Sequence, residues 1–233
     1  SARAFAVRGG KYSVTVEDLI KLAKEIGYDG ITLRRGQIDE TTPEAEVARL
    51  RDLLKKYDAP CSFVTGASAS DEAGLQALCA VIDRAASVGA FVVQPTVRAV
   101  AEISCMQRAS DYAAARNVAL APQLHNHTAH ENAEQAVELV DAVNRKNFGI
   151  AFEGSHLLLQ QRKVRDGAAV RLLGKRILSV CVQDYRLARG EPDAPLYDGT
   201  PFKPCLPDDP RGVNLPDVFA ALGLHLGEAL VIR

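Results

Sequence analysis

Short apolar runs alternate along the chain with longer segments in which apolar residues recur at helical spacing. The apolar runs predict strands at residues 4–8, 29–34, 61–65, 91–95, 118–123, 148–152, 177–182 and 230–232. The longer segments predict helices at residues 19–26, 44–54, 70–88, 99–116, 132–143 and 163–173. Strands that alternate with helices in this way predict a parallel sheet covered by helices, which is an α/β fold.

The first two predicted helices carry start signals of their own. Thr15 and Asp18 have the spacing of a capping box, and Gly27 follows the helix that they open. Pro43 stands at the start of the second helix, where the missing N–H of proline does no harm. These signals support the helix positions independently of the apolar spacing.

The order of the predicted elements favours a (β/α)₈ TIM barrel over a doubly wound open sheet. Eight strands that alternate with helices are the pattern of this barrel, with no helix after the strand at 230–232. A doubly wound nucleotide fold has little support, because no G-x-G-x-x-G and no phosphate loop follow the first strand. We therefore expect one domain spanning residues 1–233. A missing last helix would expose Leu230 and Ile232, so we expect a homo-oligomer or a partner subunit to cover this flank.

A long proline-rich segment, residues 187–214, separates the last two predicted strands. It contains many of the eleven prolines of the chain, namely Pro192, Pro195, Pro201, Pro204, Pro207 and Pro210. A structureless segment of this length inside a compact domain is usually functional. Its place after a barrel strand predicts a lid over the barrel mouth, in which Tyr197 and Phe202 find packing partners. The alternative is a stiff surface excursion.

Polar side chains follow the predicted strands 118–123 and 148–152 at their carboxyl ends. Gln123, His125 and His127 end or follow the first strand, and Glu153 and His156 follow the second. Because the carboxyl ends of barrel strands meet at one edge, we expect these side chains to form a site. Glu153 follows an apolar strand directly and is hard to explain as a surface residue.

Net charge, apolar run length and cysteine content narrow the class of protein. A formal net charge of −1 and a pI near 6.5 argue against nucleic acid or an anionic membrane as partner, since both favour a basic surface. No apolar run approaches the ~20 residues of a membrane helix, and no targeting segment is visible at the start. The five cysteines form no C-x-x-C pair, so neither a zinc ribbon nor a disulfide framework is indicated. We expect a cytoplasmic protein.

Four segments resemble the xylose isomerase-like TIM barrels, the sugar phosphate isomerase and epimerase superfamily. They are Gly27-Tyr-Asp-Gly-Ile-Thr-Leu-Arg34, residues 118–127, residues 148–156 and Ser179-Val-Cys-Val-Gln-Asp184. The resemblance extends over nearly the whole chain. It implies a small-molecule sugar or keto-acid substrate and a divalent metal (Mn, Mg, Co or Zn) held at the carboxyl ends of the last four strands. Carboxylates would then move a proton between adjacent carbons.

The metal ligands that the resemblance implies are only partly present in this sequence. The family's Glu, Asp, His and Glu positions fall on Gln123, Glu153, Cys181 and Arg233. Only Glu153 keeps a carboxylate, and hard cations prefer anionic oxygen. Either the site is vacant, or it is rebuilt from Glu153, Gln123 and Cys181, where the thiol would favour zinc. A rebuilt site could also draw on His125, His127 and His156. A vacant site could pair Glu153 with Arg34 or Arg233.

The candidate roles follow from the strand positions and from the resemblance. We expect Glu153, His156 and His125 to be catalytic. We expect the substrate to be bound by Arg34, Gln123, His127, Asp184 and Arg186. Three functions remain open: an isomerase or epimerase with an altered metal site, a metal-free lyase or dehydratase, and a non-catalytic barrel that binds carbohydrate or supports a partner subunit. His127 and His130 are also compatible with solvent-facing positions in their loop.

Overall fold

The computed structural model describes residues 5–7, 11–207 and 209–223, and it divides into two compact units. The first unit comprises Ser1–Val97, Ala101–Pro122 and Arg145–Asn147, and the second comprises Arg98–Val100, Gln123–Asn144 and Phe148–Arg233. The predicted strand at 230–232, its uncovered flank and Arg233 lie outside the described residues.

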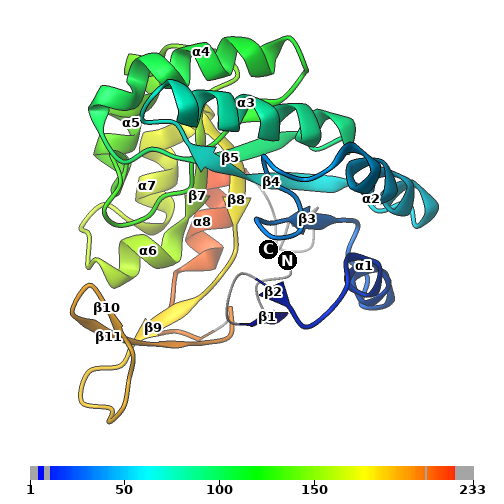
Figure 1. The fold of residues 1–233 in the computed structure, drawn as a ribbon. Coiled ribbons are helices and arrows are strands. Elements are labelled where there is room, and N and C mark those ends of the chain that lie inside the picture. The colour runs from blue at the N-terminus through cyan, green and yellow to red at the C-terminus, as the bar shows by residue number, and fades with distance from the viewer. Residues whose placement is uncertain (1–4, 8–10, 208, 224–233) are drawn as a thin grey trace. The chain divides into compact units, whose positions relative to one another are not determined.

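A four-stranded parallel sheet forms the centre of the first unit (Figure 1). Its strands, in spatial order, are β3 (Ile31–Leu33), β4 (Cys61–Ser68), β5 (Val92–Thr96) and β6 (Ala119–Leu120). The side chains of Leu33, Val64, Val93 and Leu120 are fully buried. Near-continuous apolar strands of this kind are typical of a parallel sheet whose faces are both covered.

The first helix of this unit precedes β3 in sequence and the others lie between the strands of the sheet, as the apolar spacing predicts. They are α1 (Val16–Glu25), α2 (Glu44–Lys56), α3 (Glu72–Ser87) and α4 (Ile103–Ala114), the last preceded by the 3-10 turn η2 (Val100–Glu102). The predicted N-cap at Thr15 is confirmed, because the Thr15 hydroxyl accepts a hydrogen bond of 3.1 Å from the backbone N–H of Asp18. The same hydroxyl donates to the Asp18 carboxylate over 2.7 Å. Gly27, with φ +88°, follows the end of α1.

The predicted strand at residues 4–8 does not enter the parallel sheet with its described residues. Ala6–Val7 (β1) instead pairs antiparallel with Lys11–Tyr12 (β2), and Val7 is 49% exposed. Gly9 and Gly10 stand between the two pairing segments in the sequence, and such a dipeptide between short extended runs favours a hairpin. The apolar run was too short to distinguish a hairpin arm from a buried strand.

The second unit contains the parallel pair β7 (Ile150–Glu153) and β8 (Ile177–Cys181). Gln123 adds an isolated parallel bridge to Ala151, so the end of the 118–123 segment lies beside β7. The helices of this unit are α5 (Ala133–Val143), α6 (Gly154–Leu159), α7 (Asp166–Leu173) and α8 (Leu215–Leu222), and the 3-10 turn η3 (Gly174–Arg176) follows α7. The short helix α6, which was not predicted, begins immediately after Glu153.

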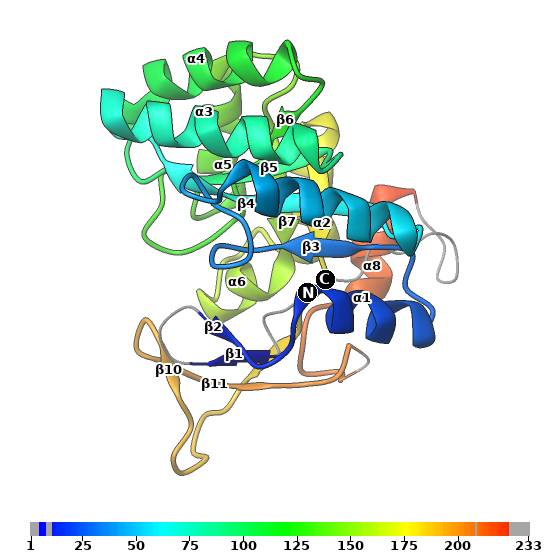
Figure 2. The same ribbon diagram turned by 45° about the vertical axis from the view of Figure 1, so that its right-hand side comes forward.

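The proline-rich segment is not structureless, so that part of the prediction is wrong. We call residues 185–212 the excursion. It contains β9 (Tyr185–Leu187), β10 (Leu196–Tyr197) and β11 (Thr200–Pro204), which form an antiparallel sheet in the order β10–β11–β9 (Figures 1 and 2). Asp198 and Gly199 both have positive φ (49° and 78°) and make the two-residue turn between β10 and β11. The Asp-Gly dipeptide is a strong local signal for such a hairpin.

Two further properties of the described residues bear on function. None of their helices is long and apolar enough to cross a membrane. All five cysteines, each of which lies in the described part of the chain, carry free thiols.

Candidate functional site

Glu153 is a buried carboxylate at the carboxyl end of β7. Glu153 is 2% exposed, and its Oε1 atom accepts a hydrogen bond of 2.7 Å from the Ser155 hydroxyl. The Nε2 atom of His156 lies 3.2 Å from the same oxygen, and the side-chain amide of Gln123 donates to Oε2. A buried carboxylate is unfavourable unless donors stabilise its charge. Here three side chains supply those donors.

Gln123 and Glu153 meet because their strands are neighbours, as the sequence predicts. The parallel bridge from Gln123 to Ala151 brings the two strand ends together. The amide nitrogen of Gln123 must face Glu153, because the amide oxygen would place two acceptors against each other. Gln123 is therefore a hydrogen-bond donor to Glu153 and cannot at the same time offer its oxygen there.

His130 is a buried side chain that contacts the backbone at the end of this strand. It is 1% exposed, which corrects the alternative of a solvent-facing position. Burial lowers the pKa of His130 from 6.5 to about 4, so the ring is neutral near pH 7. Its Nε2 lies 2.9 Å from the backbone oxygen of Gln123 and donates to it. His130 thus has a structural contact with the site.

Three aromatic rings gather beside Glu153. The centroids of His125 and His156 are 4.3 Å apart, and those of His156 and Tyr197 are 5.3 Å apart. The hydroxyl of Tyr197 lies 2.8 Å from Nδ1 of His156 and accepts a hydrogen bond of 3.2 Å from the backbone N–H of Asn126. Burial raises the pKa of Tyr197 above its ordinary value. Tyr197 was not among the predicted site residues.

His127 contacts the hairpin turn of the excursion. Its side chain is exposed, and Nε2 lies 3.5 Å from Oδ1 of Asp198. Its backbone N–H donates to Glu131 over 3.2 Å, and its φ is +56°. These contacts place His127 beside the turn of the β10–β11 hairpin, and its predicted substrate contact stays a prediction.

The donors around Glu153 do not fit a hard divalent cation. Cys181 is the register neighbour of Glu153 across β7 and β8, so the two predicted ligands do lie close together. Gln123 and Ser155, however, direct hydrogen atoms at the carboxylate where a metal would need lone pairs. Among the residues described, no group of three or more His, Cys, Asp or Glu side chains is arranged to hold a metal ion.

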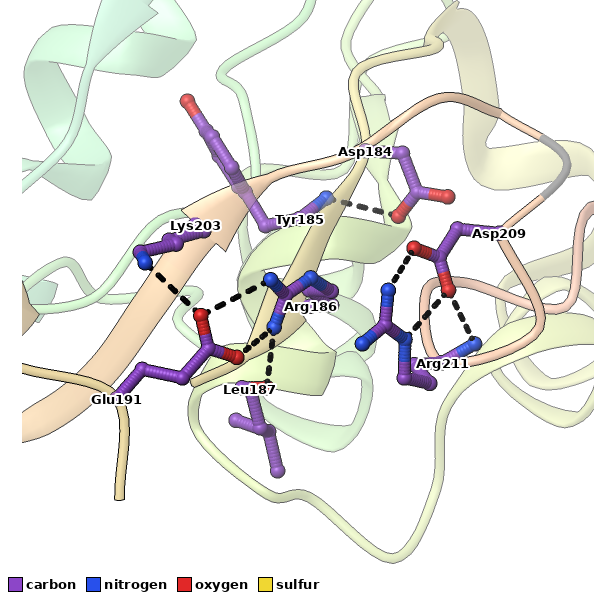
Figure 3. Close-up of polar contacts among 8 residues, drawn as sticks. All are labelled: Asp184, Tyr185, Arg186, Leu187, Glu191, Lys203, Asp209 and Arg211. Carbon is purple, nitrogen blue, oxygen red and sulfur yellow. Dashed lines mark hydrogen bonds and ion pairs between the residues drawn. The ribbon is translucent and has the colours of Figure 1, made fainter. Parts of the chain in front are cut away.

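Asp184 ties together the two ends of the excursion. Its Oδ1 accepts hydrogen bonds from the backbone N–H groups of Tyr185, over 2.8 Å, and Val213, over 2.9 Å (Figure 3 shows the first). Its backbone oxygen accepts from the N–H of Cys205 over 3.2 Å. Burial raises the pKa of the Asp184 carboxyl despite these donors. The observed contacts of Asp184 are structural, and its predicted contact with substrate stays a prediction.

Arg186 forms its ion pair inside the excursion. Its guanidinium contacts the Glu191 carboxylate, and Lys203 Nζ lies 2.9 Å from the same group (Figure 3). These two cations lower the pKa of Glu191 to about 2. In the first unit, Arg34 follows β3, and its backbone N–H donates to the Gln37 side chain over 3.1 Å. The predicted substrate contacts of both arginines stay predictions.

The fold and a polar site at the carboxyl ends of parallel strands define a (β/α)₈ protein of the TIM barrel class, as predicted. A family model described as the xylose isomerase-like TIM barrel matches residues 20–223. The chain belongs to this family.

Solved structures with the same fold support this class. A D-psicose 3-epimerase determined in the presence of D-fructose has a TM-score of 0.70 and 15% identity, covering 94% of this chain and 79% of that chain. A xylose isomerase-like TIM barrel protein from Mycobacterium smegmatis in complex with magnesium has a TM-score of 0.71 and 14% identity, covering 94% and 83%. The D-allulose 3-epimerase from Methylomonas sp. in complex with D-allulose has a TM-score of 0.66 and 18% identity, covering 89% and 73%. No curated protein matches the sequence.

Proposed function

We propose that this chain is a sugar or keto-acid isomerase or epimerase that transfers a proton next to a carbonyl group. The observation that carries the proposal is the buried Glu153 carboxylate, which meets Gln123 and His156 at the carboxyl ends of neighbouring strands. The similarity in fold to D-psicose and D-allulose 3-epimerases agrees with a sugar substrate.

The proposed chemistry uses Glu153 as the proton-transferring group. A carboxylate oxygen of Glu153 takes the proton from the carbon next to the carbonyl, and the electron pair of that C–H bond forms the carbon–carbon double bond of an enediolate. The negative charge moves to the former carbonyl oxygen. Return of the proton from Glu153 to the former carbonyl carbon, while the hydroxyl proton of the enediolate moves to the former carbonyl oxygen, gives the isomer. Delivery of a proton to the original carbon from the opposite face, by a donor other than Glu153, gives the epimer.

We propose that hydrogen-bond donors, in place of a hard cation, stabilise the enediolate in this chain. Gln123 and His156 direct N–H groups at the Glu153 carboxylate, and in the proposed step these donors turn to the substrate oxygen as Glu153 takes up the proton. The described residues around Glu153 do not fit Mg²⁺ or Mn²⁺. This proposal corresponds to the vacant-site alternative from the sequence.

A second candidate function is carbohydrate binding without catalysis. It is favoured by one observation, namely that both oxygens of Glu153 already accept hydrogen bonds. Hydrogen bonds to a carboxylate favour its charged form and so make it a weaker base. A metal-free lyase would use the same first step and differ in its product.

Incubation in D₂O with a panel of keto-sugars and 2-keto acids tests the proposal. We expect NMR to show deuterium incorporated next to the carbonyl by the wild-type protein, by the exposed-site control Glu134→Gln, and not by Glu153→Gln. Deuterium incorporation that persists in Glu153→Gln would show that Glu153 is not the proton-transferring group. Saturable binding without exchange would favour the second candidate, and an elimination product would identify a lyase.

The same assay tests the proposed independence from metal. We expect exchange to continue after treatment with a chelator, because no cation is assigned to the step. Loss of exchange that Mn²⁺, Mg²⁺, Co²⁺ or Zn²⁺ restores would overturn this part of the proposal and leave the role of Glu153 standing.

The five free cysteines support the further proposal of a reducing, cytoplasmic environment. The proposed homo-oligomer or partner subunit can be tested by light scattering of the purified chain, where a monomeric mass at all concentrations would contradict it.

A further inference from the structure

We propose that Tyr197 is a positioning residue that holds His156 in the tautomer with its proton on Nε2 and so directs that N–H at Glu153. The inference deepens the proposed function, on which its catalytic consequence rests. Its structural part rests on the contacts among Asn126, Tyr197, His156 and Glu153, all of which lie in the second unit.

The position of Glu153 determines which nitrogen of His156 carries the proton. Nε2 lies 3.2 Å from Oε1 of Glu153, and both side chains are buried. A lone pair on Nε2 would face the carboxylate oxygen, and two acceptors at this distance repel each other. The proton therefore sits on Nε2. In a neutral ring, Nδ1 is then an acceptor that needs a donor.

Tyr197 supplies that donor. Its hydroxyl oxygen lies 2.8 Å from Nδ1 of His156, a normal distance for a hydrogen bond to a ring nitrogen. The same oxygen accepts from the backbone N–H of Asn126 over 3.2 Å. A hydroxyl has one proton and two lone pairs, so an oxygen that accepts from Asn126 can donate its own proton to His156.

The hydrogen bonds therefore form a chain with one direction. Asn126 N–H donates to Tyr197, the Tyr197 hydroxyl donates to His156, and His156 Nε2–H donates to Glu153. Each donor in such a chain strengthens the next, because polarisation adds along it. The chain ends on the carboxylate that we assign to proton transfer.

The excursion is built to hold the Tyr197 hydroxyl in place. Tyr197 pairs with Thr200 across the two-residue turn formed by Asp198 and Gly199, so the hairpin fixes its backbone. Its ring meets Phe202 edge-on at 6.3 Å. The same ring of Phe202 packs edge-on against Tyr185 at 5.0 Å. These aromatic contacts connect the three strands of the excursion and leave the Tyr197 ring little freedom.

The test compares the tautomer of His156 with and without the Tyr197 hydroxyl. Protein labelled with ¹⁵N-histidine gives ring nitrogen signals, which the His156→Gln variant assigns. In the wild type we expect a protonated Nε2 and an unprotonated, hydrogen-bonded Nδ1. In Tyr197→Phe we expect the Nδ1 signal to move towards that of a free acceptor, or the two tautomers to interconvert. The slowly exchanging proton signal that we expect from the Tyr197 hydroxyl of the wild type should also disappear in this variant.

Tyr185→Phe is the matched control, because it removes a hydroxyl from the same small sheet while the Tyr185 ring stays against Phe202. It should leave the His156 signals unchanged. Unchanged His156 signals in Tyr197→Phe would overturn the proposal, and so would a doubly protonated His156 in the wild type. Equal shifts in both variants would show an effect of the sheet and not of the hydroxyl, which also overturns it.

The outcome is distinguishable from failure of the proposed function, since the NMR measurement needs no substrate. If the NMR signals are as expected but the protein shows no turnover, the positioning role of Tyr197 is supported and the proposed isomerase or epimerase function is contradicted. Where the exchange assay shows turnover, Tyr197→Phe should lower kcat about fivefold to tenfold, the effect of one hydrogen bond, and leave KM nearly unchanged. An equal fall in Tyr185→Phe would contradict the positioning role.

Discussion

The side-chain amide of Gln123 donates to the carboxylate of Glu153 at the point where the family pattern places a second carboxylate. Gln123 supplies an N–H donor where the family pattern has a charged oxygen. The site therefore holds a donor and an acceptor in place of two acceptors. The amide stabilises the negative charge of Glu153 by hydrogen bonding, whereas two carboxylates at the same distance need a proton or a cation between them.

Gln123→Glu should therefore create a demand for a divalent cation. Without metal we expect a loss of about 1–3 kcal/mol in the free energy of unfolding, since one buried group loses its partner. With Mn²⁺ at a hundredfold excess over its Kd, we expect the free energy of unfolding of the variant to rise by about 2.7 kcal/mol. Its melting temperature should rise accordingly. Gln161→Glu, at an exposed glutamine of the same unit, is the control. Equal responses of both variants to Mn²⁺ would contradict the prediction.

His130 should make the stability of the protein depend on pH. Its pKa is lowered from 6.5 to about 4 by burial, so the unfolded chain binds a proton more readily than the folded one. The stabilisation is present above pH 6.5 and is lost as pH falls towards about 4, with a slope of at most about 1.4 kcal/mol per pH unit.

Urea denaturation across this pH range measures the effect of His130. His130→Gln can keep a donor for the Gln123 backbone but cannot titrate, so it should show a smaller slope than the wild type. His127→Gln removes an exposed histidine and should retain the wild-type slope. Identical slopes in all three proteins would show that His130 is not the group responsible.

Asp184→Asn should change stability in the opposite sense with pH. Burial raises the pKa of Asp184 in the folded protein, so its contribution is present below the ordinary value of 3.8 and is lost as pH rises through the raised pKa. The asparagine keeps the Oδ1 acceptor. We expect the stability of the variant relative to the wild type to increase from pH 3 to pH 7. Asp193→Asn, at an exposed position, should give a flat difference, and a flat difference for Asp184→Asn as well would contradict this reasoning.

Gly154→Ala should destabilise the second unit through a single close approach. A Cβ atom at Gly154 would lie 2.9 Å from Cγ1 of Val213, which is too close for two carbons. Overpacking of this kind costs about 1–3 kcal/mol. The double variant with Val213→Ala removes the opposing methyl, so its loss should be smaller than the sum of the two single losses. Additive losses in a denaturation cycle would show that the contact does not limit packing.

The regular elements could be predicted because each rests on a local signal. The Thr15 N-cap and the apolar strands β4, β5 and β8 were found at the predicted places. Carboxyl ends of neighbouring strands share an edge in any parallel sheet, so the proximity of Gln123 to Glu153 also followed from sequence. The predicted structureless loop failed because proline content was given more weight than the Asp198-Gly199 hairpin signal.

The hydrogen-bond partners of the site could not be predicted from sequence. The contact between Tyr197 and His156 joins residues 41 positions apart through a small antiparallel sheet, and no periodicity encodes it. The charge on Arg186 suggested a ligand contact, but only the folded hairpin shows Glu191 and Lys203 beside it. Side-chain pairing of this kind depends on rotamers fixed by tertiary packing.

The closure of the excursion by Asp184 bears on protein engineering. The Asp184 carboxylate accepts hydrogen bonds from the backbone N–H groups of Tyr185 and Val213, so it holds the two ends of the excursion together. The entropic cost of lengthening a loop with fixed ends grows only slowly with its length. Residues 192–194, between the ion pair of Glu191 and the backbone contact of Pro195, are therefore a suitable place for sequence libraries or grafted segments. Tyr197 and its turn can be left intact in such libraries.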